Sequence, residues 1–370
     1  MADKARQQMM AWAYDLFQHM YSEAPYRLSP SGKALPAWHY FIEVTRRCNL
    51  RCRMCQYLSY LENVPVAEQK KGELSLDEWK NVVDQTNRLG LITFTGGEPL
   101  VRSDFFDLLA YASARRRTHF ISNATMLKEA AVHSCVELAP ARLGGKGLNA
   151  LGVSLEAPDE LHDEIRHQKG AFEKSTDGVR LLTEARKKAG KTCPLIHITT
   201  VIQQANVHVL AEMPALAASL GADSLNLVTE TRLHDLPGLG EEPPGKWRAS
   251  DLEWPRVDRT ALEKALAETD EAARRHNIEL RLPRMPREEL LKYYDGGIDA
   301  RQYTCRSPWN TLIIGRTGDV FPCWLQKIGN VREEKLATMW NSAQTRAFRR
   351  ACRNCLFPVC PGCCFIEYKK

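Results

Sequence analysis

Three cysteines stand within eight positions in the segment "RRCNLRCRMC", at Cys48, Cys52 and Cys55. A disulfide would leave the third thiol over, and a zinc site would need a fourth Cys or His, for which residues 39–69 offer only His39. Three thiolates can instead bind three irons of a [4Fe–4S] cluster, which leaves the fourth iron without a protein ligand. An iron with an open position can bind and activate an external molecule, so the spacing predicts a reactive cluster.

The remaining cysteines are concentrated in the tail of the chain. Of twelve cysteines in total, seven lie in the last 66 residues, and only Cys135 and Cys193 fall between the two groups. In a reducing compartment so many thiols favour metal binding over disulfide formation. We interpret Cys135 and Cys193 as ordinary core or surface thiols.

Composition limits the classes of function and location. The formal net charge is only +6 and the basic residues are scattered, so we predict no nucleic-acid partner. The first 21 residues lack the basic start and apolar centre of a signal peptide, and no apolar run is long enough to span a membrane. We therefore expect a cytoplasmic protein without a membrane segment.

The elements that must position the cysteines alternate between short β-rich segments and helical ones such as "SLDEWKNVVD", which Ser75 can cap. Six β/α units in series indicate a parallel sheet, because parallel neighbours need crossovers. Six units can build a partial barrel or a doubly wound sheet, and in both the function gathers at the carboxyl ends of the strands. The cysteine loop directly follows the first strand. The predicted strands are 39–45, 91–96, 118–123, 150–156, 195–202 and 224–230.

The tail has a different character from the alternating core. Its sequence predicts two strands around a turn at Gly318, then one helix that leads to "CRNCLFPVCPGCC". Because a segment this short cannot build much of an apolar core, we expect bound metal to organise the tail. We predict a helical extension over 1–38 with a helix at 6–21, a barrel core over 39–235, a linker with a long loop and a helix over 236–300, and a small domain over 301–370.

The cysteine loop, taken together with "TGGEP" at 95–99, resembles the radical S-adenosylmethionine (SAM) enzymes. The resemblance covers residues 39–230 and implies a partial (β/α)6 TIM-type barrel of the α/β class. It implies that Cys48, Cys52 and Cys55 hold a [4Fe–4S] cluster. SAM would complete this cluster through its amino and carboxylate groups.

The same resemblance implies residues that contact SAM. Glycines at a strand end let the backbone approach a ligand, and a carboxylate can orient an ammonium group. One departure is His167, which stands where the family usually has Gly. Asn206 resembles a further position at the ligand end of a strand. The implied SAM-binding residues are Met54, Gly96, Gly97, Glu98, Asn123, Ser154, Glu156 and Arg166.

The tail resembles a SPASM domain or its shorter twitch form, an α+β extension that binds auxiliary clusters. The resemblance implies two auxiliary [4Fe–4S] clusters, one of them with an open iron because the tail supplies seven thiolates and not eight. A single auxiliary cluster and a structural zinc site are the alternatives. The implied tail ligands are Cys305, Cys323, Cys352, Cys355, Cys360, Cys363 and Cys364.

The implied reaction is reductive cleavage of SAM, after which a 5′-deoxyadenosyl radical abstracts hydrogen from the substrate. The implied partners are an electron donor such as flavodoxin or ferredoxin and a peptide substrate, with or without a separate protein that presents the peptide. A small molecule such as a sugar or tetrapyrrole is the alternative substrate, and a cluster-bearing sensor without catalysis is a further one. Trp324 stands where sulfatase-maturing relatives carry an acidic residue, which argues against that activity. The sequence assigns no catalytic acid or base.

Overall fold

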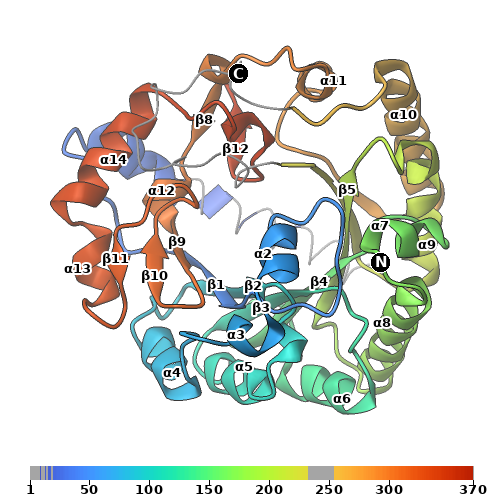
Figure 1. The fold of residues 1–370 in the computed structure, drawn as a ribbon, viewed down its shortest axis with the longest axis horizontal. Helices are drawn as coiled ribbons and strands as arrows, with labels where there is room; N and C mark the ends of the chain where they lie inside the picture. Colours follow the sequence, from blue (N-terminus) through green and yellow to red (C-terminus); the bar gives the residue numbers. More distant parts are fainter. Residues whose placement is uncertain (1–8, 10–12, 14–15, 18–19, 232–253, 370) are drawn as a thin grey trace.

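A ten-stranded sheet forms the centre of the molecule (Figure 1). The computed structural model describes residues 9, 13, 16–17, 20–231 and 254–369. The strand order in the sheet is β11-β10-β9-β1-β2-β3-β4-β5-β6-β7. Their bounds are β1 His39–Thr45, β2 Leu91–Gly96, β3 Arg117–Ser122, β4 Gly147–Ser154, β5 Leu195–Ile202, β6 Ser224–Thr229, β7 Glu279–Arg281, β9 Thr311–Ile314, β10 Asp319–Phe321 and β11 Gly329–Asn330.

The six predicted β/α units are confirmed. Three predicted strands have the observed bounds, and β3, β4 and β6 differ from their predictions by one to three residues at an end. The strands β1 to β6 pair in parallel with their sequence neighbours. The helices between them are α2 Leu58–Asn63, α3 Val66–Gln69, α4 Leu76–Asp84, α5 Phe105–Ser113, α6 Glu129–Leu138, α7 Leu161–Arg166, α8 Ala171–Lys188 and α9 Met213–Ser219, and α10 Arg259–Arg275 follows β6.

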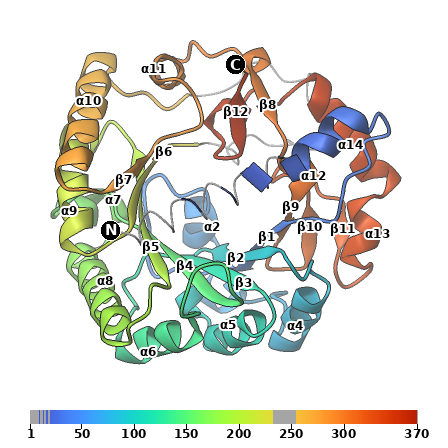
Figure 2. The same ribbon diagram turned by 180° about the vertical axis from the view of Figure 1, so that it is seen from behind.

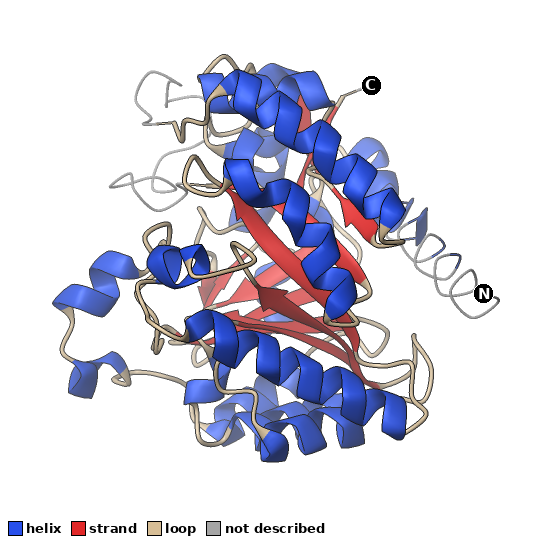
Figure 3. Ribbon diagram, turned by 90° about the vertical axis from the view of Figure 1, so that its right-hand side faces the viewer, coloured by secondary structure: helices blue, strands red, loops and turns tan. Residues whose placement is uncertain are grey.

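The sequential strand order selects the barrel over the doubly wound sheet. Each crossover steps to the next strand in the same direction, and right-handed crossovers then place every helix on the same face. The helices accordingly form an outer ring in both views down the short axis (Figures 1 and 2). From the side, the strands run through the middle with helices outside them (Figure 3).

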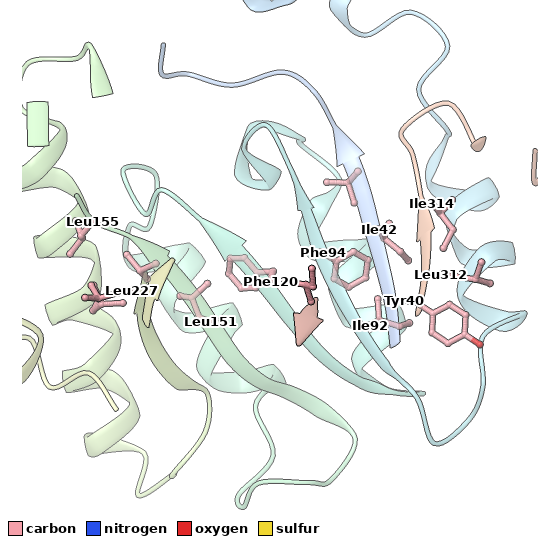
Figure 4. Packing of buried hydrophobic residues seen from close by; sticks show 14 of the residues in the cluster. Tyr40, Ile42, Ile92, Phe94, Phe120, Leu151, Leu155, Leu227, Leu312 and Ile314 are labelled. Carbon is pink, nitrogen blue, oxygen red and sulfur yellow. The ribbon is translucent and has the colours of Figure 1, made fainter. Parts of the chain in front are cut away.

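Apolar side chains fill the layer between the sheet and these helices. On β3 and β5 buried residues alternate with half-buried ones, because one face packs on the helices and the other faces the barrel interior. Figure 4 shows side chains of this layer, among them Ile42, Phe94, Phe120 and Leu151, each without solvent exposure. The rigid layer fixes where the carboxyl ends of the strands lie.

The tail continues the barrel sheet. The predicted hairpin at Gly318 is confirmed, since β9 and β10 pair antiparallel around it. Strand β9 also pairs in parallel with β1, the strand that leads into the cysteine loop. The remaining tail elements are β8 Tyr303–Cys305 paired with β12 Ile366–Tyr368, and the helices α11 Arg287–Asp295, α12 Ser307–Asn310, α13 Leu336–Trp340 and α14 Ala343–Asn354.

Two details of the helix predictions need correction or fall outside the described chain. The single tail helix is two helices, because Ser342 caps a new one by accepting from the Thr345 main-chain N–H. The helix predicted over 6–21 and the loop predicted after residue 230 lie largely outside the described residues. No helix in the described part of the chain is long and apolar enough to cross a membrane.

The start of α4 is fixed by a capping box, which yields a test of the fold. Ser75 accepts from the Glu78 main-chain N–H, and the Glu78 side chain accepts from the Ser75 N–H. We expect Ser75→Ala to lower the free energy of unfolding by about 1 kcal/mol, because an end donor loses its partner. Urea unfolding followed by circular dichroism measures the change. Ser134→Ala is the control, because Ser134 bonds only a carbonyl of its own helix, and an equal loss there would contradict the capping role.

Candidate active site

The cysteine loop lies at the carboxyl end of β1, and its three cysteines belong to one small apolar cluster. Leu50 and Cys52 are buried together with Ala171 at the start of α8, and Cys48, Met54 and Cys55 pack against them. Burial raises the pKa of the Cys48 thiol to about 12, and the neighbouring thiols Cys52 and Cys55 add to the rise. A thiol in such a place is neutral until a metal replaces its proton.

The "TGGEP" turn holds the first part of this loop. The main-chain N–H of Gly97 donates to Thr45 O at 2.8 Å, and that of Glu98 donates to Arg47 O at 2.9 Å. A Cβ atom on Gly96 would lie 2.1 Å from Thr45 O, and one on Gly97 would lie 2.3 Å from Arg47 O. The glycines are therefore required by the approach of the cysteine loop itself, and their contact with SAM stays a prediction.

Carboxylates neutralise two of the arginines that crowd around the cysteines. Arg47 makes a bidentate pair with Glu73, at 3.1 and 3.2 Å, and Arg46 pairs with Glu43 at 3.2 Å. Arg102 approaches the same Glu73 at 3.6 Å and donates to the carbonyls of Val44 and Leu74. These pairs, in which the carboxylates are buried and Arg46 and Arg47 are partly exposed, anchor the chain just before Cys48. Residue patterns did not reveal Glu73, because its partner Arg47 is distant in the sequence.

Glu98 is fully buried and connects two strand ends. Its carboxylate accepts from Leu100 N at 3.1 Å, from Ser122 Oγ at 2.9 Å and from Asn123 N at 2.7 Å. Burial raises the pKa of Glu98 to about 7, although these donors oppose the rise. Three donors leave room for one more on a carboxylate, which fits the predicted ammonium group.

Asn123 reaches the cysteine loop from the end of β3. Its Nδ2 donates to Asn49 Oδ1 at 3.0 Å and lies 4.0 Å from Cys48 Sγ. Its Oδ1 accepts from Thr125, from the main-chain N–H at 3.0 Å and from the hydroxyl at 2.7 Å. Asn123 is thus placed to orient the loop beside the first cysteine.

The carboxyl end of α7 supports the opposite side of the loop. The main-chain N–H groups of Arg51 and Arg53 donate to the last carbonyls of the helix, on Arg166 and Ile165, at 3.4 and 3.1 Å. The next residue, His167, has φ 55° and ψ 38° in the left-handed region. This conformation explains why glycine is usual at this position, and here an exposed histidine adopts it.

Arg166 and Glu156 form a buried ion pair next to the second cysteine. Arg166 Nη2 donates to Glu156 Oε1 at 2.6 Å, and Nη1 lies 3.4 Å from Cys52 Sγ. Burial opposes the charge of Arg166, but Glu156 and Cys52 outweigh it and raise the pKa of the guanidinium. The buried Nε of Arg166 has no hydrogen-bond partner among the described residues.

The other predicted ligand-end residues differ in what they contact. Ser154 ends β4 half-buried, whereas Asn206 is fully buried and its amide donates to the carbonyls of Glu156 and Val201. The Asn206 oxygen accepts from Gln203 N at 2.9 Å. Because Asn206 is saturated by backbone, it holds the ends of β4 and β5 in place rather than facing a ligand.

Four of the seven tail cysteines form a second group. All twelve cysteines lie in the described residues and carry free thiols. Cys352 is buried, whereas Cys355 and Cys364 are exposed, and Cys135 and Cys193 have no solvent exposure. A small cavity is lined by four of the tail thiols, those of Cys305, Cys323, Cys360 and Cys363.

Two contacts fix the tail cysteines relative to the barrel. Gly362 O accepts from the Thr229 hydroxyl at the end of β6, at 2.7 Å, and a Cβ on Gly362 would lie 2.2 Å from Tyr293 Oη. On the other side, the ring of Phe365 lies 5.3 Å from that of Phe41 on β1, edge to face. The cysteine-rich segment thus contacts both β6 and β1.

The residues fit the cofactors that the sequence implies. Three free thiols gather at a strand end, Arg166 Nε is a buried donor in need of an acceptor, and Glu98 retains an acceptor site. Among the residues that the structure describes, no three His, Cys, Asp or Glu side chains lie close enough together to hold a single metal ion. A four-iron cluster is larger than one ion and accepts thiolates from more widely spaced positions.

Comparisons with known proteins agree with this geometry. The model of the radical SAM superfamily matches residues 42–206, and that of the SPASM iron-sulfur cluster-binding domain matches residues 305–364. An AdoMet-dependent heme synthase of Oleidesulfovibrio alaskensis is 29% identical over 90% of this chain and 83% of its own. A PqqA peptide cyclase of Granulibacter bethesdensis is 27% identical over 81% of this chain and 73% of its own.

Solved structures show the same fold. SuiB of Streptococcus suis bound to S-adenosylmethionine superposes with a TM-score of 0.61 at 17% identity, over 89% of this chain and 73% of that one. SuiB bound to its precursor peptide SuiA gives a TM-score of 0.60 at 18% identity, over 86% and 68%.

The close contact between Gly97 and the cysteine loop predicts that position 97 cannot accommodate any side chain. We expect Gly97→Ala to abolish iron binding at the cysteine loop, because its Cβ would meet the backbone carbonyls of Arg46 and Arg47 at 2.6 and 2.3 Å. Iron analysis after anaerobic reconstitution measures the loss. Gly145→Ala is the control, since its Cβ would meet nothing closer than 3.5 Å, and normal iron content in both variants would disprove the constraint.

The left-handed conformation of His167 predicts a stabilising substitution. We expect His167→Gly to raise the free energy of unfolding by about 0.5–1 kcal/mol, because glycine adopts this conformation without strain. His133→Gly, at an exposed site inside α6, should instead lower it by about 1 kcal/mol. Urea unfolding of both variants is the measurement, and a loss of stability in His167→Gly would contradict the assignment.

Proposed function

This chain belongs to the radical SAM superfamily and carries a C-terminal SPASM domain, and from this premise we propose that its cysteine loop is the catalytic centre. Cys48, Cys52 and Cys55 would hold a [4Fe–4S] cluster with one open iron. The single observation that carries the proposal is that these thiols gather at the carboxyl end of β1, docked on the "TGGEP" turn.

The chain's own residues would bind and orient SAM. The cluster held by Cys48, Cys52 and Cys55 would supply the reductive cleavage of SAM, and with it the radical chemistry that removes hydrogen from a substrate. Glu98 has one acceptor site left for the SAM ammonium group, and the unpartnered Arg166 Nε is a donor for its carboxylate. Ser154 ends its strand half-buried, in a position suited to the ribose, and Met54 packs beside the cysteines where adenine is expected.

The tail would hold at least one auxiliary cluster. Cys305, Cys323, Cys360 and Cys363 line one cavity, and four thiolates complete a [4Fe–4S] cluster. Cys352, Cys355 and Cys364 are left for a second cluster, which would have an open iron. Iron analysis distinguishes the cases, at about 8 irons per chain for one auxiliary cluster and about 12 for two.

We propose a peptide as the first candidate substrate. The support is the shared fold with SuiB, which is solved with a precursor peptide, and the relationship to PqqA peptide cyclases. The proposal includes a flavodoxin or ferredoxin as the electron donor and a separate protein that presents the peptide. An auxiliary cluster near the barrel mouth would accept the electron left on an oxidised substrate.

A tetrapyrrole is the second candidate substrate. Three AdoMet-dependent heme synthases are 26–29% identical over 89–90% of this chain. The PqqA peptide cyclases, at 25–28%, are nearly as similar, so identity alone does not rank the two candidates.

Anaerobic turnover tests the catalytic proposal. With SAM and dithionite, we expect the reconstituted protein to form 5′-deoxyadenosine, and Cys52→Ala to form none, because two thiolates cannot hold the cluster. Liquid chromatography with mass spectrometry measures the product. Cys135→Ala is the control, because that thiol is buried in the core, and wild-type protein that contains iron but forms no product would disprove catalysis in favour of a sensor.

Product analysis on the two candidate substrates then separates the alternatives. A mass loss of two hydrogens from a precursor peptide supports peptide crosslinking, whereas loss of carbon dioxide together with two hydrogens from a carboxylated tetrapyrrole supports the second candidate.

A further inference from the structure

One contact of Arg166 is not explained by SAM binding. We propose that Arg166, held in place by Glu156, tunes the reduction potential of the catalytic cluster by donating an N–H···S hydrogen bond to Cys52. This inference rests on the proposed function of the cysteine loop. It concerns the protein before SAM arrives, since the contact joins two groups of the chain itself.

The guanidinium of Arg166 is divided between a thiol and a carboxylate. Nη1 lies 3.4 Å from Cys52 Sγ and Nη2 lies 2.6 Å from Glu156 Oε1. Arg166 is 7% exposed and Cys52 is also 7% exposed, so water does not screen the interaction. The main-chain carbonyl of Arg166 accepts from Arg51 N, which fixes the distance between the helix end and the loop.

Hydrogen bonds fix the position of Glu156 independently of the cysteine loop. Its second oxygen, Oε2, accepts from the Val201 main-chain N–H on β5 at 2.9 Å, and its own N–H donates to His162 Nδ1 at 3.1 Å. Burial raises the pKa of Glu156, and Arg166 offsets part of the rise. The carboxylate therefore holds the guanidinium against the sheet, in one orientation toward Cys52.

The other two thiols receive only neutral donors. Cys48 Sγ lies 3.4 Å from Leu50 N and 4.0 Å from the Asn123 amide, and Cys55 Sγ lies 3.4 Å from Tyr57 N. Within the described part of the chain, Cys52 is thus the front thiol with a charged hydrogen-bond donor. The asymmetry indicates a specific role for this pair rather than general packing.

The physical effect on the cluster has a definite sign. Hydrogen bonds to ligand sulfurs and nearby positive charge stabilise the more negative, reduced form and raise the potential. The Glu156 carboxylate, which lies farther from the sulfur, opposes this effect by neutralising the guanidinium. Removing the two partners should therefore shift the potential in opposite directions.

The test is an EPR-monitored redox titration of the reconstituted full-length protein without SAM. The signal of the catalytic cluster is identified as the one that changes when SAM is added afterwards and that is missing in Cys52→Ala. We expect a lower midpoint potential in Arg166→Gln and a higher one in Glu156→Gln. Arg53→Gln is the matched control, because the exposed Arg53 side chain belongs to the same loop and, among the described residues, no hydrogen bond joins it to a thiol. Its potential should equal the wild-type value.

Each outcome decides the inference. Shifts of opposite sign in the two variants support it, and unchanged potentials or shifts of the same sign overturn it. A role for Arg166 in SAM binding alone would weaken SAM affinity without moving the SAM-free potential, which also overturns it. If Arg166→Gln fails to retain iron, Glu156→Gln decides alone: a raised potential supports the inference, and an unchanged or lowered potential overturns it. Wild-type protein without a SAM-sensitive signal would instead disprove the proposed function.

Discussion

The site depends on the contact between two pieces of backbone, the "TGGEP" turn and the start of the cysteine loop. Gly97 N and Glu98 N donate to the carbonyls of Thr45 and Arg47. The two segments are so close that a Cβ atom on Gly96 or Gly97 would not fit between them. This contact makes the ends of two parallel strands into one rigid platform. Glu98, buried beneath it, extends the platform to the end of β3.

Charged side chains reinforce the platform from both ends. On one side, Glu73 forms an ion pair with Arg47, which directly precedes Cys48, and lies close to Arg102. On the other side, Glu156, which follows β4, forms an ion pair with Arg166. Buried pairs of this kind are costly to form, and breaking one partner leaves an uncompensated charge. In this site the pairs fix the orientation of the arginines, since each arginine also contacts the cysteine loop or the strand that leads into it.

Local sequence was sufficient for the elements and for the position of the loop. The strands β1, β2 and β5 are apolar, β-rich runs followed by turns, so their bounds are readable from residues such as Ile42 or Ile198 and their neighbours. The spacing of three cysteines within eight positions was enough to predict a cluster-binding loop. The pairing of β9 with β1 joins residues more than 250 positions apart, and such pairing leaves no trace in either strand alone.

The roles of individual polar residues were the least predictable part. Asn123, which the resemblance places near SAM, bonds Asn49 in the cysteine loop, and Arg166 contacts Cys52 and Glu156 as well as offering a free nitrogen. The resemblance located these side chains at the correct edge of the sheet. Their partners depend on the packing of α7 and of the loop, which only three-dimensional coordinates reveal.

The pairing of β9 with β1 has a consequence for protein engineering. Because the tail contributes β9, β10 and β11 to the edge of the barrel sheet, a chimera joined near residue 300 would strip β1 of one neighbour. The orphaned edge would then be free to recruit a foreign strand. Exchange of tails between relatives should therefore transplant β1 and β9 as a matched couple, or place the junction beyond β11.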